Sequence, residues 1–106
     1  MAESRAHRDA KRRAAGRSGK NECPLPSGRR LDACTPARAI EVERSGQPLL
    51  LRRAAERLAE SGKSQHVLIV PNHHMDLADK AMREVGVTGT VKNLGGTRSH
   101  SIRRRS

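Results

Sequence analysis

Apolar residues follow a helical spacing in the middle of the chain and a strand-like run directly after it. From Pro48 to Gly62 they recur at i, i+3, i+4, i+7 and i+8, which predicts an amphipathic helix. Pro48 suits the first turn of such a helix, and Gly62 suits its end. The continuous apolar run in His66–Val70 predicts a strand that is covered on both faces. The buried stripe of the helix is expected to comprise Leu51, Ala54, Ala55, Leu58 and Ala59.

Three shorter segments before this helix are typical of strands. Asn21–Leu25 and Arg29–Ala33 flank a Pro-Ser-Gly turn and together predict a hairpin, and Arg38–Glu43 predicts a third strand. A helix that connects this third strand to His66–Val70 forms a crossover. We therefore expect those two strands to be parallel neighbours.

Weaker patterns predict the elements near the two ends of the chain. Alanines at every fourth position predict a helix over residues 2–15, and a further helix follows Pro71-Asn72 and runs to about Val85. Thr90–Leu94 is expected to form a last strand. From Gly95 on, the composition of Gly, Ser, Thr and Arg predicts disorder.

The expected fold class is therefore α/β, in the order helix, three strands, helix, strand, helix and a final strand. The sheet is expected to be mixed and flanked by helices. We expect one domain over residues 1–94, in which 1–20 form a basic helix and linker. Residues 95–106 are expected to be a basic disordered tail.

Charge is concentrated at the two ends of the chain. The 106 residues carry 22 Lys and Arg against 11 Asp and Glu, a formal net charge of +11. Residues 1–20 hold seven basic and two acidic side chains, and residues 97–106 hold four basic and no acidic ones. Basic ends on a nearly neutral body suit a polyanion, so we expect nucleic acid, and DNA in particular, as the partner. A solvated, non-specific basic tail is the alternative.

Arginines are the residues expected to contact phosphates. Those on the middle helix have a second interpretation, because they are also spaced to pair with Glu56 and Glu60 of the same helix. Phosphate contacts position a protein on nucleic acid without reading its bases. The expected contacts are Arg5, Arg8, Arg12, Arg52, Arg53, Arg103, Arg104 and Arg105.

Composition also argues against several classes of protein. The chain has no Phe, Trp or Tyr, so it lacks the stacking platforms of common single-strand readers. No apolar stretch approaches the roughly 18 residues that span a bilayer. The first residues are charged and lack the apolar region of a secretory signal, so we expect a cytoplasmic protein without a membrane partner.

Two cysteines and a histidine pair are further candidates for chemistry. Without a secretory signal, Cys23 and Cys34 are expected to be reduced and partly buried. Together with His73 and His74 they do not match a known zinc spacing. The histidines follow a strand, where ligand sites of α/β sheets often lie, but capping of the next helix by Asn72 or His74 is the alternative.

Acidic residues on the expected strands stand out in this basic chain. Side chains alternate along a strand, so Glu41 and Glu43 share one face, and Asp32 faces away from Leu31 and Ala33. If the apolar faces coincide, these three carboxylates converge, and an acid on the first strand could join them. Close carboxylates repel one another unless a cation lies among them. That cation is either a divalent Mg²⁺ or Mn²⁺, which oxygen ligands suit, or one of Arg30, Arg38 and Arg44.

The segments that hold these acids resemble the PD-(D/E)XK nuclease superfamily, which includes type II restriction enzymes and archaeal-type Holliday junction resolvases. Over residues 4–71, a first helix is followed by Gly-Lys-Asn-Glu22, Gly-Arg-Arg-Leu-Asp32 and Ala-Ile-Glu41-Val-Glu43. The shared core of that superfamily is a helix, a three-stranded meander, a crossover helix and a parallel strand. This is the order expected here.

The resemblance implies a restriction-endonuclease-like core and a magnesium or manganese cofactor. Asp32 and Glu41 match the acidic motif residues, and Glu22 matches the acid that many members carry on the first strand. The implied metal ligands are Asp32, Glu41 and Glu22, and the implied catalytic residues are Asp32, Glu41 and Glu43. The chain departs from the motif at Glu43, where a lysine is usual. A basic residue that orients water would then come from Arg44, Arg52 or Arg53.

Three functions follow from these observations. The first is a metal-dependent endonuclease that hydrolyses phosphodiester bonds in DNA; a junction-cleaving member would be expected to act as a homodimer. The second is a catalytically inactive relative that binds nucleic acid, which Glu43 in place of lysine favours. The third, suggested by the missing aromatic residues, is a basic polypeptide that folds poorly on its own.

Overall fold

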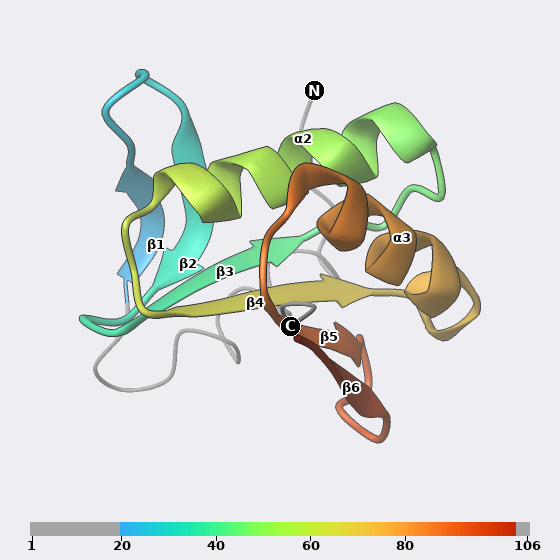
Figure 1. Ribbon diagram of the computed structural model, residues 1–106. Coiled ribbons are helices and arrows are strands. Elements are labelled where there is room, and N and C mark those ends of the chain that lie inside the picture. Colours follow the sequence, from blue (N-terminus) through green and yellow to red (C-terminus); the bar gives the residue numbers. More distant parts are fainter. Residues whose placement is uncertain (1–19, 104–106) are drawn as a thin grey trace.

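The computed structural model describes residues 20–103, with side chains from residue 23 on. The expected helix over residues 2–15 lies outside the described residues. Within them, the expected order of elements from the first strand to the last helix is confirmed (Figure 1). The elements are β1 (Lys20–Pro24), β2 (Arg30–Cys34), β3 (Arg38–Val42), α2 (Pro48–Glu60), β4 (Gln65–Val70), the short 3₁₀ helix η1 (Asn72–His74), α3 (Met75–Val85), β5 (Gly89–Asn93) and β6 (Ser99–Ile102).

The strands form one mixed sheet of six strands in the order β1-β2-β3-β4-β5-β6. The pairs β3–β4 and β4–β5 are parallel, and the other three pairs are antiparallel. The parallel pairing of β3 with β4 confirms the expectation from the crossover, because α2 carries the chain back along the sheet. The parallel strands are therefore central, and the antiparallel hairpins lie at both edges.

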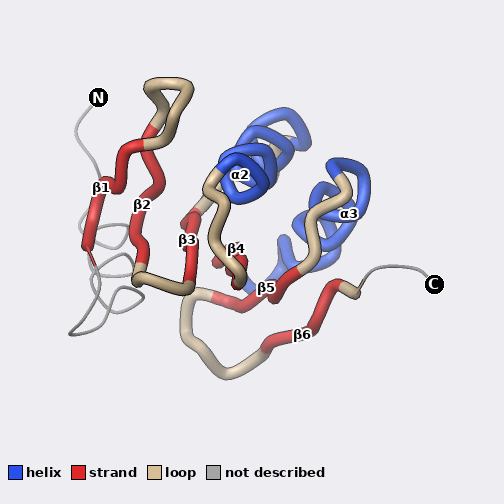
Figure 2. Tube along the Cα trace, turned by 60° about the vertical axis from the view of Figure 1, so that its left-hand side comes forward, coloured by secondary structure: helices blue, strands red, loops and turns tan. Residues whose placement is uncertain are grey.

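Both described helices cover the same face of the sheet, which curves around them (Figure 2). The stripe expected on α2 is confirmed at four positions, since Leu51, Ala54, Ala55 and Leu58 are buried. Helix α3 ends where Gly86 adopts a left-handed conformation with φ +84°, which glycine tolerates without strain. No helix among the described residues has the length and apolar character needed to cross a membrane.

The core is divided between the two faces of the sheet. The larger cluster lies between the sheet and the helices and includes Leu31, and a smaller cluster on the opposite face comprises Ala33, Ile40 and Val67. We expected Leu31 and Ala33 on one side of their strand, and this is wrong. The alternation along β2 is interrupted at Asp32, where the strand leaves β3.

The region after Gly95 also differs from expectation, because residues 99–102 form strand β6 instead of a disordered tail. The buried side chain of Asn93 explains the difference. Its Oδ1 accepts the backbone N–H groups of Thr97 and Arg98 at 2.9 and 3.1 Å, and its Nδ2 donates to Thr97 Oγ1 at 2.9 Å. These bonds hold the turn that returns the chain alongside β5.

The cysteines form a disulfide, so the expectation of reduced thiols is wrong. Cys23 on β1 and Cys34 on β2 are bonded, with their Cα atoms 6.3 Å apart. Both residues belong to the larger core cluster, and pairing of β1 with β2 brings them together. Their separation of 11 residues along the chain could not reveal this proximity.

Reduction of the Cys23–Cys34 disulfide should lower the free energy of unfolding by about 2–4 kcal/mol, because the bond restricts the unfolded chain. Urea denaturation with and without dithiothreitol measures the change. The double variant Cys23→Ala/Cys34→Ala is the control and should not respond to the reductant. If the urea midpoint of the wild-type protein were the same with and without dithiothreitol, the result would contradict the disulfide.

Candidate functional site

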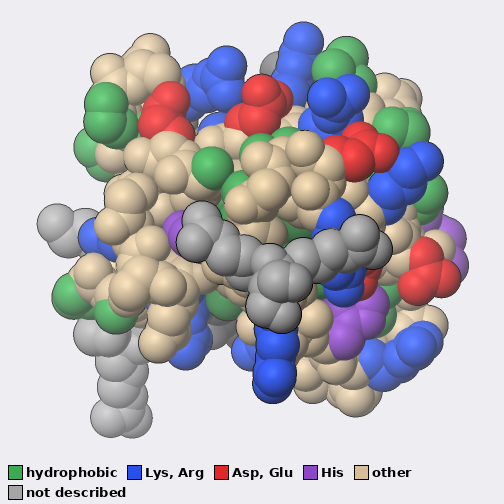
Figure 3. Space-filling model, in the orientation of Figure 1, with side chains coloured by type: hydrophobic (Ala, Val, Ile, Leu, Met, Phe, Trp, Pro, Cys, Tyr) green, Lys and Arg blue, Asp and Glu red, His purple; other side chains and the backbone are tan. Residues whose placement is uncertain are grey.

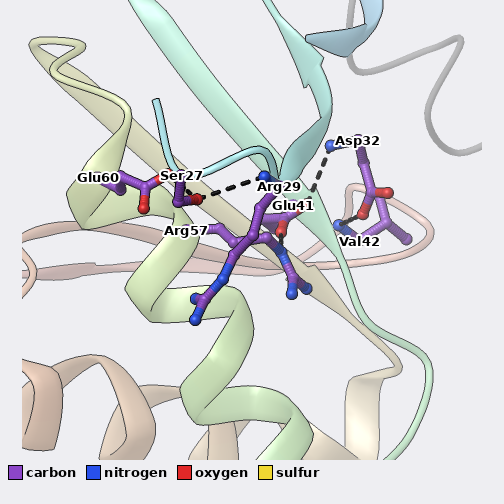
Figure 4. Close-up of polar contacts among 7 residues, drawn as sticks. All are labelled: Ser27, Arg29, Asp32, Glu41, Val42, Arg57 and Glu60. Carbon is purple, nitrogen blue, oxygen red and sulfur yellow. Dashed lines mark hydrogen bonds and ion pairs between the residues drawn. The ribbon is translucent and has the colours of Figure 1, made fainter. Parts of the chain in front are cut away.

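The ladder between β2 and β3 opens at Asp32 and Glu41. Ala33 pairs with Ile40 and Cys34 with Ala39, but beyond these pairs side chains replace the strand-to-strand bonds. The backbone N–H of Asp32 donates to Glu41 Oε2 at 3.0 Å, and the backbone N–H of Val42 donates to Asp32 Oδ2 at 2.8 Å (Figure 4). The two carboxylates thus lie in the opening between the strands and satisfy its backbone amides.

Helix α2 closes this opening from above with Arg57. Its Nε donates to Glu41 Oε1 and forms an ion pair with it (Figure 4). The Glu41 side chain is 1% exposed and that of Arg57 is 25% exposed, so the pair is screened from most solvent. Both oxygens of Glu41 therefore have donors, one from β2 and one from α2.

Contacts of the β1–β2 turn fix the position of α2 relative to the strands. Ser27 Oγ donates to Glu60 Oε2 at 2.7 Å, and the backbone N–H of Arg29 donates to Ser27 Oγ at 3.3 Å (Figure 4). Glu60 is one turn beyond Arg57 on the same helix. The turn therefore restrains the end of α2 that carries the guanidinium over the carboxylates.

The surroundings of Glu41 favour its neutral form. Burial, the charge of the Asp32 carboxylate and a hydrogen bond with it raise the pKa of Glu41 to about 8. The hydrogen bond and charge of Arg57 act in the opposite direction but do not cancel these effects. A pKa of about 8 favours the protonated form of Glu41 at neutral pH.

The remaining expected metal and catalytic residues do not join this pair in the described part of the chain. Glu43 follows β3 and is half-buried, and its Oε1 accepts the backbone N–H of Ser45 at 3.0 Å. The side chain of Glu22 lies outside the described residues. Among those described, no group of three or more His, Cys, Asp or Glu side chains is placed to hold a metal ion.

The arginines expected to contact nucleic acid have different surroundings. Arg52 is exposed and its Nε lies 3.7 Å from Glu84 Oε2, so it pairs with α3 and not within its own helix. Arg53 and Arg103 are exposed. The others fall outside the described residues: Arg5, Arg8, Arg12, Arg104 and Arg105.

Arg57 is the site residue that the sequence did not single out as a partner of Glu41. With Arg52 and Arg53, we expected it either to contact phosphates or to pair with Glu56 and Glu60 of the same helix. It borders the buried stripe of α2, three residues after Ala54 and directly before Leu58. The sequence did contain one signal for this contact: Arg57 lies at the edge of the buried stripe of α2, and that stripe was expected to pack on the sheet that carries the acidic residues.

We expected Asn72 or His74 to cap the next helix, but no side chain forms a capping hydrogen bond at the start of η1 or of α3. The His74 ring instead packs against Gly46, where an added Cβ would lie 2.7 Å from Nε2. This contact joins the loop after β3 to the loop after β4. It gives His74 a packing role at the carboxyl edge of the sheet.

Comparison with known proteins identifies no relative: no family model matches the chain, and no curated protein or solved structure is significantly similar to it. The chemistry of the site is therefore inferred from its own geometry. That geometry is a pair of carboxyl groups on adjacent strands, of which the buried one, Glu41, is paired with the guanidinium of Arg57.

The free energy of unfolding should depend on pH through Glu41. A pKa raised from 4.5 to about 8 means that the folded protein holds the proton more tightly than the unfolded chain. The resulting stability is fully present below pH 4.5 and is lost as the pH rises through about 8. One pKa unit corresponds to about 1.4 kcal/mol, so the loss should reach a few kcal/mol.

Urea denaturation in EDTA at pH 5 and pH 8.5 measures this difference. Glu41→Gln should remove most of the decline, because the amide does not ionise. Glu56→Gln is the matched control, since Glu56 is an exposed carboxylate on α2, and it should keep the wild-type pH dependence. Equal pH dependence in Glu41→Gln and the wild type would show that Glu41 ionises normally.

Proposed function

We propose that the protein is a metal-dependent nuclease whose centre is the Asp32–Glu41 pair. The observation that carries the proposal is the meeting of these carboxylates where β2 separates from β3. Two carboxyl groups placed together by backbone bonds, close enough for Asp32 to raise the pKa of Glu41, are typical of functional sites. A salt bridge with Arg57 would need only one carboxylate, so it does not explain why Asp32 lies beside Glu41.

The donor chemistry of the pair fits a hard divalent cation. Both side chains offer oxygen only, and magnesium is commonly held by one or two carboxylates with water and substrate phosphates as the other ligands. A cation between the carboxylates would also remove the repulsion that raises the pKa of Glu41. Asp32 and Glu41 would hold Mg²⁺ or Mn²⁺, and Glu22 of β1 is the further ligand implied by the resemblance.

The order of the strands supports the same proposal. An antiparallel β1–β2–β3 meander is followed by α2 and the parallel strand β4, as in the core of the PD-(D/E)XK superfamily. The acidic residues lie on the second and third strands of this meander, which are the strands that carry the motif there. We therefore extend the proposal to a restriction-endonuclease-like core.

Each residue of the site has a definable part in phosphodiester hydrolysis. A bound divalent ion would supply charge neutralisation and a more acidic water. Asp32 and Glu41 would hold this ion, and Arg57 fixes the Glu41 carboxylate from α2. Glu43, held by the Ser45 amide beside the end of β3, is the candidate general base that accepts a proton from the attacking water. Arg53 and Arg103, which are exposed, would neutralise substrate phosphates.

A second candidate is a catalytically inactive protein that keeps this architecture and binds nucleic acid. Arg57 favours it, because the guanidinium already supplies a positive charge to Glu41. Glu43 also stands where the superfamily has lysine. In this case the carboxylates would serve only to close the gap between β2 and β3.

Cleavage of plasmid DNA distinguishes the two candidates. We expect nicking that requires Mg²⁺ or Mn²⁺ and that falls roughly 100-fold or more in Asp32→Asn and Glu41→Gln, the scale on which charged groups of active sites contribute. Binding to the same DNA in EDTA should persist in both variants. Glu56→Gln, which removes an exposed carboxylate from α2, is the control and should cleave normally.

Two results would contradict the nuclease. Undiminished cleavage in both variants would place the activity elsewhere or in a contaminant. DNA binding without cleavage at any concentration of either metal would leave the inactive binding protein as the function.

A further inference from the structure

The face of the sheet opposite the helices is polar and basic over β3 to β6. Directly paired residues of adjacent strands point to the same face, so the register defines its members. Arg38 pairs with Gln65, Val67 with Thr90, and Ile69 with Lys92. The series continues through the pairing of Thr90 with Ser101 and Lys92 with Ser99. Beyond the buried apolar residues, this face therefore presents cations, hydroxyls and an amide.

A cavity of about 540 Å³ lies against this face, at the starts of β4 and β5 and the end of β6. Three cations line it: Arg38, Lys92 and Arg103. Hydroxyl groups of Ser64, Thr90 and Ser101 line it as well. No carboxylate among the described residues contributes to the lining. The cavity thus collects donors and positive charge without a built-in counterion.

The cations of this cavity also lack ion pairs with any carboxylate in the part of the chain that the structure describes. Neither Lys92 nor Arg103 forms an ion pair with a described residue. The Nε of Arg38 donates to the neutral Gln65 Oε1 at 3.1 Å, which orients the guanidinium and leaves its charge uncompensated. Arg38 and Lys92 are half-buried, so part of their hydration is already lost.

Cations on the helical side are in the opposite situation. Arg52 and Lys80 lie within 4 Å of Glu84, and Arg83 pairs with Asp79. Figure 3 shows basic and acidic side chains intermixed along the top of the molecule, over α2, whereas its lower rim shows Lys, Arg and His without Asp or Glu. The sequence accounts for this division, because residues 61–75 and 86–103 contain no acid at all.

We propose that this cavity binds phosphate groups of a nucleic-acid backbone. Arginine, lysine and hydroxyl side chains are the groups that proteins use for such contacts. The cavity has no Phe, Trp or Tyr side chain, since the chain has none, so it lacks the usual platforms for base stacking. A chain of phosphates offers a separate anionic group to each of the three cations, which a single orthophosphate does not.

The site is distinct from the Asp32–Glu41 pair and would bind whether or not that pair is catalytic. Glu41 faces α2, whereas the cavity lies on the other face of the sheet. Binding measured in EDTA therefore tests the inference separately from the nuclease proposal.

Fluorescence anisotropy of a labelled 20-base-pair duplex, titrated with the full chain in EDTA at several salt concentrations, provides the test. Lys92→Gln/Arg103→Gln should weaken binding at least about tenfold and reduce the slope of log K against log salt by about two. The matched control is Lys80→Gln/Arg83→Gln, which removes the same charge from exposed positions of α3. It should change affinity less than about twofold. Lys92→Arg should retain wild-type binding.

Three results would overturn the inference. Equal losses in the two double variants would mean that binding depends only on net charge. Unchanged binding in Lys92→Gln/Arg103→Gln would remove the cavity from the interface. Tripolyphosphate binding can be measured by calorimetry and by competition with the duplex. If Lys92→Gln/Arg103→Gln lost its binding of tripolyphosphate but kept its binding of DNA, the cavity would be a site for a small polyphosphate and not for nucleic acid.

Discussion

The buried carboxylate of Glu41 connects three elements that otherwise separate at this point. It receives a backbone N–H from β2 and a guanidinium from α2, while it belongs to β3. A buried charge without partners would cost several kcal/mol, so these donors are a condition for the residue being there. The opening between β2 and β3, the placement of α2 and the contact with Asp32 all depend on this one side chain.

The arrangement stabilises the fold and at the same time leaves an electrostatic deficit. Burial and the neighbouring charge of Asp32 disfavour the anionic form of Glu41, although the Arg57 guanidinium lies against it. A site that is satisfied only by holding a proton or another cation can exchange one for the other. This makes the pair a reasonable centre for metal-dependent chemistry, whereas Glu43 and Arg52, bonded to Ser45 and Glu84, have their own partners.

Charge is distributed differently on the two sides of the sheet, and this division gives them different uses. On the helical side, Arg52 and Lys80 pair with Glu84, and Arg83 pairs with Asp79. The cavity lined by Arg38, Lys92 and Arg103 has no carboxylate among the described residues. An approaching polyanion would be attracted to that face, and the acidic pair would lie within the same small domain.

The sequence by itself determined the order of strands and helices and the parallel pairing of β3 with β4, because periodicity, glycine and proline act locally and a crossover helix leaves one handed solution. The proximity of Asp32 and Glu41 could also be predicted from the sequence, since both lie on strands joined by a short turn. The tertiary structure alone decided the Arg57 contact, the disulfide and strand β6. Each of these depends on a distance between segments far apart in the chain or on the bonds of one buried side chain, Asn93, and no local pattern encodes such distances.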